Sequence, residues 1–212
     1  MQDSKISDAV VHRLPKYYRY LSELEAAGIE RVSSSRMSTD MNLNASQIRR
    51  DLNCFGGFGQ QGYGYQVNRL RQEIMKILGI GSSYKAVIVG AGNIGQALLK
   101  YRHFDEEGYH IAAVFDVEPS LIGREMGDLI IRPMSELPKF LKDNEVDIGI
   151  IAVPKRHAQQ MADELVSMGV RGLWNFAPVD VEARKGISVE NVHLSDSIYI
   201  LSYHMRENNE NH

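Results

Sequence analysis

The chain has 212 residues, 43% of them hydrophobic and 24% charged, with a formal net charge of −3; this is the composition of an ordinary soluble protein large enough for two compact domains. No apolar run approaches the roughly 18 residues of a membrane span and the first residues lack a signal-peptide pattern, so we expect a cytoplasmic protein without a membrane partner. The single cysteine, Cys54, excludes an internal disulfide, and without nearby cysteine or histidine partners it excludes a structural zinc site, so no metal is expected.

The first 80 residues have the periodicities of a helical domain with a hairpin. Apolar residues recur every three to four positions along 6–27 and predict a first helix. Ser35 is expected to cap a second, short helix, and a turn at 42–44 leads into a third helix over 45–53. Two short helices joined by a tight turn are typical of the helix-turn-helix unit.

A glycine-rich segment with aromatic residues follows, over 55–67. Its alternating pattern predicts a hairpin, which is the wing of a winged-helix domain. A further helix over about 68–78 completes this domain, which we expect to span 1–80. Residues 52–72 contain no acid, so this part of the domain is a candidate phosphate-facing surface. The arginines in and directly before it are Arg49, Arg50, Arg69 and Arg71.

The helix over 45–53 has the pattern of a DNA-recognition helix. Its apolar residues share one face, which leaves polar and basic side chains on the opposite face. Arginine can pair with guanine and glutamine with adenine, while a flanking arginine can hold a phosphate. The alternative, solvated charges on a surface helix, is disfavoured by the helix-turn-helix spacing and the wing. The predicted residues for double-stranded DNA are Ser46, Gln47, Arg49 and Arg50, with Gln60 and Gln61 in the wing.

From Lys85 onward, strand and helix patterns alternate. This alternation predicts an α/β fold, a Rossmann doubly wound parallel sheet over 81–193 with helices on both faces. The strand candidates are 86–89, 111–115, 147–153, 171–174 and 188–193. The helix candidates are 93–102, 135–143 and 157–168.

A GxGxxG motif at 90–95 lies between the first strand of this domain and its first helix. Its glycines allow a tight turn, the approach of a pyrophosphate, and close packing of helix on strand. Asp116 ends the next strand, about 20 residues later, where a carboxylate favours NAD over NADP. A second GxGxxG, at 57–62, lacks the strand, the helix and the acid, and is not predicted to bind a nucleotide.

Apolar residues end the fourth and fifth strand candidates, where ligands of open α/β sheets bind. Such a lining suits a neutral reduced nicotinamide better than the cationic oxidised ring, although Phe176 and its neighbours could also be ordinary core. The predicted NAD(H)-binding residues are Gly90, Ala91, Gly92, Asn93, Ile94, Gly95, Asp116, Val153, Pro154 and Phe176.

The last segment, 194–212, contains a helix pattern over 195–207 followed by a polar tail. Ile198, Leu201 and Met205 form an apolar stripe after the Rossmann core is complete, so we expect the helix to pack on a partner subunit. The alternative is that it covers the sheet of its own domain.

Two other functions fit the Rossmann pattern, an NAD-dependent dehydrogenase and a coenzyme-A-binding regulator. An enzyme is disfavoured because only some 20 residues remain for a substrate domain, and no Tyr-x-x-x-Lys, HExxH or GxSxG motif occurs. Lys155 and His157 could act as acid or base, but a surface role is favoured. Asp116 argues against coenzyme A, and competition between the two ligands would distinguish them.

Taken in order, these motifs resemble the Rex family of redox-sensing transcriptional repressors over nearly the whole chain. The residues that carry the resemblance are 47–52, the wing at 55–65, 89–95, 115–117, 152–154 and 175–178. The resemblance implies a homodimer with a swapped C-terminal helix, which binds operators upstream of fermentative and respiratory genes when NAD+ prevails and is released by NADH.

The resemblance also implies roles for single residues. It assigns Arg49 and Arg50 to DNA, the three glycines and Asp116 to the cofactor, and Arg19 and Tyr101 to a switch between the two sites. In some members an aspartate near the end of the last strand changes partner between those two positions. Here His193 occupies that place, and Asp196 is the nearest acid along the chain.

Overall fold

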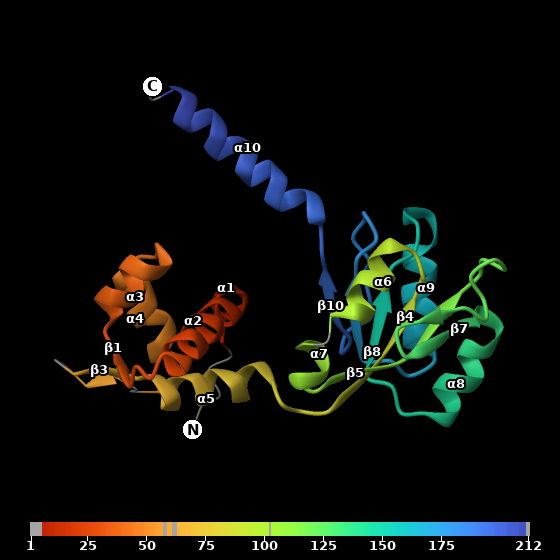
Figure 1. Cartoon of the computed structure of the whole chain (residues 1–212), viewed down its shortest axis with the longest axis horizontal. Coiled ribbons are helices and arrows are strands. Elements are labelled where there is room, and N and C mark those ends of the chain that lie inside the picture. Colours follow the sequence, from red (N-terminus) through yellow and green to blue (C-terminus); the bar gives the residue numbers. More distant parts are fainter. Residues whose placement is uncertain (1–5, 57–58, 61–62, 102, 211–212) are drawn as a thin grey trace. The chain divides into compact units, whose positions relative to one another are not determined.

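The computed structural model describes residues 6–56, 59–60, 63–101 and 103–210 (Figure 1). The chain divides into two compact units, Met1–Gly81 and Ser82–His212, which are described separately. In the described part of the chain, no helix has both the length and the apolarity needed to cross a membrane.

The first unit is a winged-helix domain, as predicted. Among its described residues, three short strands form an antiparallel sheet in the order β1-β3-β2, and β2 and β3 make the wing. Its helices are α1 (Asp8–Val11), α2 (Leu14–Ala26), α3 (Ser34–Met41), α4 (Ala45–Asn53) and α5 (Val67–Leu78). Its strands are β1 (Arg31–Val32), β2 (Gly59–Gln60) and β3 (Gly64–Gln66).

The helix predicted over 6–27 is two helices, α1 and α2. Pro15 lies in the first turn of α2, where its missing N–H is tolerated, and a continuous helix would have placed it in the interior. Apolar residues recur at helical spacing on both sides of the junction between α1 and α2 because both helices pack on the same core. That core is built from Leu14, Tyr17 and Leu21 of α2, together with buried residues of α3, α4 and α5.

The turn between α3 and α4 is held by side-chain caps. Ser33, not Ser35 as predicted, caps α3: its extended backbone lets its hydroxyl accept from the Arg36 N–H at 3.1 Å, whereas Ser35 lies inside the first turn. Asn42 ends α3 with a left-handed φ of 51°. Asn44 then caps α4 by accepting from the Ser46 N–H at 2.8 Å.

The second unit is a doubly wound α/β domain, as predicted. In the part of this unit that the structure describes, seven strands run in the order β10-β9-β8-β4-β5-β7-β6, with every neighbouring pair parallel except β6 and β7. The strands are β4 (Tyr84–Val89), β5 (Tyr109–Asp116), β6 (Glu125–Met126), β7 (Leu129–Pro133), β8 (Ile148–Ile151), β9 (Gly172–Asn175) and β10 (Ser188–Asn191). The helices are α6 (Asn93–Lys100), α7 (His103–Glu106), the 3-10 helix η1 (Met134–Glu136), α8 (Leu137–Asp143), α9 (Lys155–Ser167) and α10 (Leu194–Glu210).

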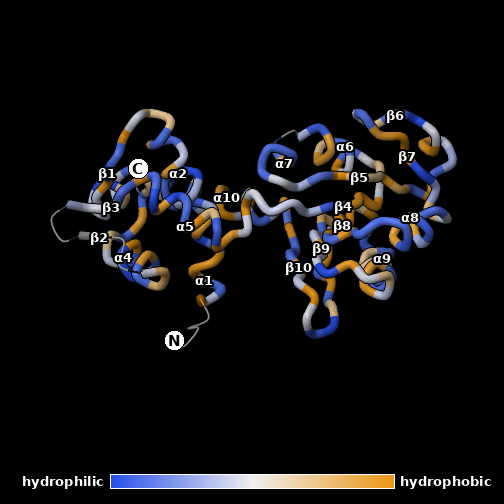
Figure 2. The backbone as a smooth tube through the Cα atoms, turned by 90° about the horizontal axis from the view of Figure 1, so that it is seen from below, coloured by the Kyte–Doolittle hydropathy of each residue, from blue (hydrophilic) through white to orange (hydrophobic). Residues whose placement is uncertain are grey.

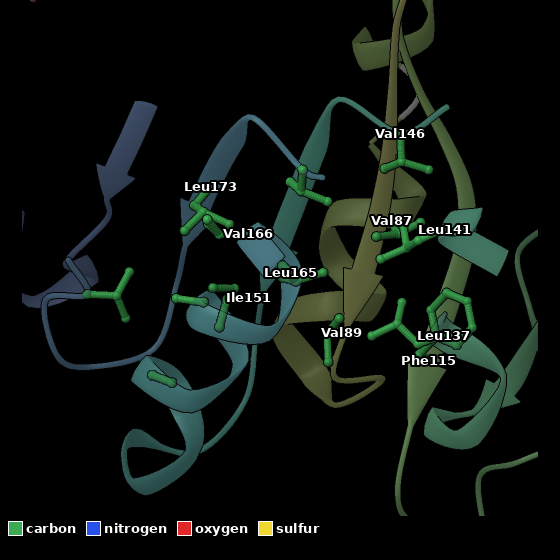
Figure 3. Close-up of a cluster of buried hydrophobic side chains, with 14 of the residues drawn as sticks. Val87, Val89, Phe115, Leu137, Leu141, Val146, Ile151, Leu165, Val166 and Leu173 are labelled. Atoms are coloured by element: carbon green, nitrogen blue, oxygen red, sulfur yellow. The ribbon is translucent and has the colours of Figure 1, made fainter. Parts of the chain in front are cut away.

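Apolar side chains cover both faces of this sheet. On one face, residues of α8 and α9 such as Leu141 and Leu165 pack against Val87, Phe115 and Ile151 (Figure 3). On the other face, α6 packs against the remaining side chains of β4 and β5. The central strands β4, from Ala86 onward, and β8 are accordingly mostly hydrophobic (Figure 2), which is typical of parallel strands buried on both sides.

Strands β6 and β7 were not predicted from the sequence. These strands lie at the end of the sheet, and in β7 exposed and buried residues alternate, so neither has the continuous apolar run of the central strands. β7 pairs with β5 from Val114 to Asp116. It therefore supports the strand whose end carries the predicted ribose-binding carboxylate.

Candidate functional sites

A cleft of about 860 Å³ lies at the carboxyl ends of β4, β5 and β8. β4 is the strand on whose two sides the chain winds in opposite directions, and ligands of open α/β sheets bind at this point. The lining residues that the sequence predicted are Gly90, Gly92, Asn93, Ile94, Asp116, Val153 and Pro154. Those that it did not predict are Val89, Val117, Glu118, Leu121, Met134, Ala152, His157, Gln160, Met161 and Glu164.

The three glycines of the 90–95 motif have different surroundings. A Cβ on Gly90, whose φ is +106°, would collide with the Ala152 carbonyl, and a Cβ on Gly95 would collide with the Gly90 carbonyl. Gly90 therefore permits the approach of β4 to the chain after β8, and Gly95 permits the approach of α6 to the turn. A Cβ on Gly92 would meet no atom within 4 Å. Space beside Gly92, at the N-terminus of α6, fits the close approach of a pyrophosphate.

Asp116 is fixed at the edge of this cleft by two backbone groups. One carboxylate oxygen accepts from the Ala91 N–H at 2.6 Å, and the other accepts from the Glu118 N–H at 2.8 Å. The first bond joins the end of β5 to the glycine-rich turn. Each oxygen keeps a lone pair for a further donor, so the carboxylate is oriented in advance for ribose hydroxyls.

Three of the predicted cofactor residues do not line the cleft. Ala91 is buried and its N–H is taken by Asp116, while Gly95 packs beneath the turn. Phe176 is 9% exposed and lies against Trp174, with ring centroids 4.7 Å apart, in the apolar cluster on the α6 face of the sheet.

One face of α9 lines the cleft, and the sequence did not predict it. Its residues His157, Gln160, Met161 and Glu164 recur at helical spacing, and Gln160 donates to Glu164 at 2.8 Å. The signal was available in principle, because the helix that follows β8 must begin at the carboxyl edge of the sheet. The sequence alone did not show which face of that helix would meet the ligand.

The exposed face of α4 is polar and basic, as predicted. Ser46, Arg49 and Arg50 are exposed, and Gln47 is partly so. Arg49 donates to the Ser34 hydroxyl at 3.0 Å, which links the two helices of the helix-turn-helix.

The wing is attached to the rest of its domain by the pairing of β3 with β1 and by the Arg31 side chain. This residue of β1 donates to the Tyr63 carbonyl at 3.3 Å and lies 6.0 Å from the centre of that ring. Of the two glutamines predicted in the wing, Gln60 belongs to β2, and Gln61 lies outside the described residues.

Residues 52–72 contain no acid, but an acid from another helix lies against one of their arginines. Glu25 of α2 pairs with Arg71 at 2.5 Å, and the guanidinium of Arg71 lies 5.8 Å from the centre of the Tyr18 ring. Arg71 therefore stabilises the packing of α2 on α5, and its assignment to a phosphate-facing surface is corrected. The acid that neutralises it is 46 positions earlier in the chain, so the local pattern did not reveal it.

The residues implied in a switch are divided between the two units. Arg19 is exposed on α2 of the first unit. Tyr101 is exposed at the end of α6 in the second unit, where its ring contacts that of Phe104 edge-on.

His193 follows β10 and has a carboxylate partner. Its Nε2 lies 2.7 Å from an oxygen of Asp180, in the connection between β9 and β10, rather than beside Asp196, its nearest acid in sequence. The hydrogen bond with Asp180 raises the pKa of His193 above its ordinary value. The pair joins the start of α10 to a loop of its own domain.

Helix α10 exposes apolar side chains on two opposite faces. Leu194, Ile198, Leu201 and Met205 form one stripe, and Tyr199, Ile200 and Tyr203 lie on the other side. All seven are at least half exposed. A helix that is apolar on both sides requires cover on both sides.

A second cleft, of about 400 Å³, is lined by residues of α7 and of the strands β4, β5, β8, β9 and β10. Its floor is apolar, with Ile148, Ile150 and Leu173 beside the rings of Phe104 and Trp174. Among the residues with described positions, no cluster of three or more histidine, cysteine or acidic side chains could hold a metal ion.

Comparison with known proteins finds matches to both units of the chain. A family model described as "CoA binding domain" matches residues 81–179, and one described as "Putative DNA-binding protein N-terminus" matches residues 5–53. A curated relative from Clostridium botulinum (strain Eklund 17B / Type B), the redox-sensing transcriptional repressor Rex, is 52% identical over 206 residues, covering 97% of this chain and 98% of the relative.

Solved structures also match the chain over nearly its whole length. The crystal structure of RSP in complex with β-NAD+ and operator DNA matches with a TM-score of 0.89 and 44% identity, covering 98% of this chain and 95% of the other. The structure of RSP in complex with β-NADH matches with a TM-score of 0.89 and 41% identity, covering 98% and 97%.

Proposed function

The chain belongs to the Rex family of redox-sensing transcriptional repressors, and from this premise we propose that it binds operator DNA when NAD+ prevails and releases it when NADH accumulates. The observation that carries the proposal is the combination in one chain of two sites. One is a winged helix whose α4 exposes Arg49 and Arg50, and the other is a dinucleotide cleft with an open Gly92 and a pre-oriented Asp116.

The cofactor of this cleft is NAD(H) rather than NADP(H) or coenzyme A. Asp116 accepts from the ribose hydroxyls and repels a 2′-phosphate, while Gly92 leaves room for the pyrophosphate at the start of α6. The family model's description names coenzyme A, but the related RSP structures contain NAD+ and NADH. The nicotinamide chemistry of the bound dinucleotide is not used for catalysis here; its redox state is what the protein senses.

The redox state is read through the charge of the nicotinamide ring. The part of the cleft that we assign to the nicotinamide ring has an apolar lining formed by Val153, Pro154 and Met161. An unpaired cationic ring is costly to bury in such a lining, whereas a neutral ring is not. A ligand shifts a conformational equilibrium only through its different affinities for the two states. Because NADH and NAD+ differ in their affinities for the two conformations, the fraction of protein in the DNA-binding conformation depends on which of them is bound.

DNA is read by α4 and gripped by the surrounding basic residues. Arg50 and Gln47 contact base edges in the major groove and Ser46 and Arg49 hold phosphates. Gln60 of the wing strand β2 reaches the neighbouring groove, and the sequence prediction assigns Gln61 to the same groove.

The active form is a homodimer whose α10 helices are exchanged between subunits, and it acts in the cytoplasm. Two heads at fixed spacing match a two-fold operator, and the two apolar faces of α10 receive cover from the second copy. Arg19, Tyr101 and His193 belong to the elements that change partners when the subunits move. We assign DNA binding to residues 1–80, NAD(H) binding to residues 81–193 and the joining of the subunits to residues 194–212.

Fluorescence anisotropy of a labelled palindromic operator, measured across NADH/NAD+ ratios, tests the proposal. We expect NADH to release the operator at concentrations at which NAD+ does not. NADPH and coenzyme A serve as controls and are expected to have no effect. Equal effects of NADH and NAD+ at saturation would refute redox sensing, and release by coenzyme A alone would refute the assignment of the cofactor.

A further inference from the structure

The recognition helix carries a buried carboxylate that faces away from DNA. Asp51 of α4 is 3% exposed and lies on the same buried side of the helix as Ile48 and Leu52, whereas Arg50 is exposed. A buried aspartate on a DNA-reading helix has no part in DNA contact, and its desolvation opposes folding unless it is fully paired.

Three donors pair this carboxylate. Arg13, between α1 and α2, reaches both oxygens, with its Nε 2.7 Å from one and an Nη 2.8 Å from the other. The buried Tyr17 hydroxyl of α2 donates to the first oxygen at 2.8 Å. The hydrogen bonds from Arg13 and Tyr17 outweigh burial and hold the pKa of Asp51 below its usual value, and the pair raises the pKa of Arg13. The carboxylate is therefore ionised and held from two directions.

From this geometry we infer that Arg13, Tyr17 and Asp51 are positioning residues that set the rotation of α4 in the major groove, so that they determine sequence preference without touching DNA. The inference rests on the proposed function. Ile48 and Leu52 also hold α4, but apolar contacts are non-directional and tolerate a rotation of the helix. A two-donor arginine fork on a carboxylate has a fixed geometry and does not.

Energy alone does not account for the network. Replacing a buried ion pair by apolar residues of similar volume is often neutral or stabilising. A second carboxylate on the helix-turn-helix, Asp40 of α3, is bound by Tyr20 of the same α2 at 2.7 Å, but this contact is exposed. Tyr20 therefore provides a matched tyrosine whose hydroxyl does not hold α4.

The test separates positioning from stability by removing the polar network as a unit. In the triple variant Arg13→Met, Tyr17→Phe, Asp51→Leu, no buried polar group is left without a partner, so we expect the protein to fold with an undiminished melting temperature. The ratio of its affinities for operator and random DNA should fall about tenfold, as for the loss of one bidentate base contact. NADH binding should be unchanged, and Tyr20→Phe should keep the wild-type ratio.

A folded triple variant with the wild-type ratio would overturn the inference. If the triple variant does not fold, Arg13→Lys decides, because lysine keeps the charge but loses the two-donor fork. A reduced ratio at the wild-type melting temperature supports positioning, and an unchanged ratio refutes it. Wild-type protein that fails to prefer its operator would instead refute the proposed function and this inference with it, so the two failures are distinguishable.

Discussion

Helix α10 provides the most direct test of how the subunits join. In the double variant Ile198→Ala, Leu201→Ala, the helix keeps a residue of high helix propensity at both positions while its apolar stripe loses its two central side chains. The two side chains are 53% and 51% exposed in the single chain, so about half of each remains to be covered by a partner.

The magnitude follows from this exposed half. Full burial of an isoleucine or leucine side chain stabilises by about 1.5–3 kcal/mol, so covering the exposed half contributes about 1 kcal/mol per side chain. A dimer with exchanged helices contains both side chains twice. The double variant should therefore weaken dimerisation by about 4 kcal/mol, which is about a thousandfold in the dissociation constant.

Sedimentation equilibrium over a range of concentrations measures this constant. Ser202→Ala is the matched control, because its exposed hydroxyl donates only to the Ile198 carbonyl of the same helix. We expect it to leave the dimer intact, and we expect the double variant to bind operator only at concentrations that restore the dimer. If the double variant keeps the wild-type dissociation constant, the stripe is not part of the interface and the argument for exchange fails.

Single substitutions at the dinucleotide cleft, at α4 and at the Asp180–His193 pair have separate expected effects. Asp116→Ala should reduce the preference for NADH over NADPH about tenfold by calorimetry, because the repulsion of the 2′-phosphate is lost; an unchanged preference would locate the discrimination elsewhere. Gly92→Ala should lower NADH affinity without lowering the melting temperature, since the added methyl meets no protein atom but fills the space beside the turn; undiminished affinity would exclude a pyrophosphate there. Arg50→Ala should cost about 1–3 kcal/mol in operator affinity and relax sequence preference in anisotropy assays, and a retained preference would contradict the assignment of α4. Asp180→Asn should return the pKa of His193 toward its ordinary value in an NMR titration, and an unmoved pKa would show that the pair is absent in solution.

The sign of the last effect sets a pH dependence. Because the pKa of His193 is raised in the folded protein, its pair with Asp180 stabilises fully below the ordinary histidine pKa of about 6.5. That stabilisation is lost as the pH rises through the folded-state pKa. The attachment of the start of α10 to its own domain should therefore weaken on the alkaline side.

Much of the fold could be predicted because its signals are local. Asn42 ends α3 in a left-handed conformation and Asn44 caps α4 two residues later, so the helix-turn-helix is encoded within a few positions. The turn from β4 into α6 depends on Gly90 and Gly95, each of which is required by a carbonyl nearby. The cap of α3 was predicted wrongly because two nearby serines, Ser33 and Ser35, both fit the pattern of a capping residue. Strands β6 and β7 were not predicted because their apolar pattern is weak.

The sequence by itself determined most of the helices, the central strands, their order along the chain, and which residues end the strands of the dinucleotide site. Only the tertiary structure decided which side chains meet: Asp51 with Arg13, Glu25 with Arg71, His193 with Asp180, and α9 with the cleft. The physical reason is the range of the interactions. Caps and tight turns depend on backbone groups a few residues apart, whereas these pairs form only when packing brings together elements that are 13 to 46 positions apart in the chain.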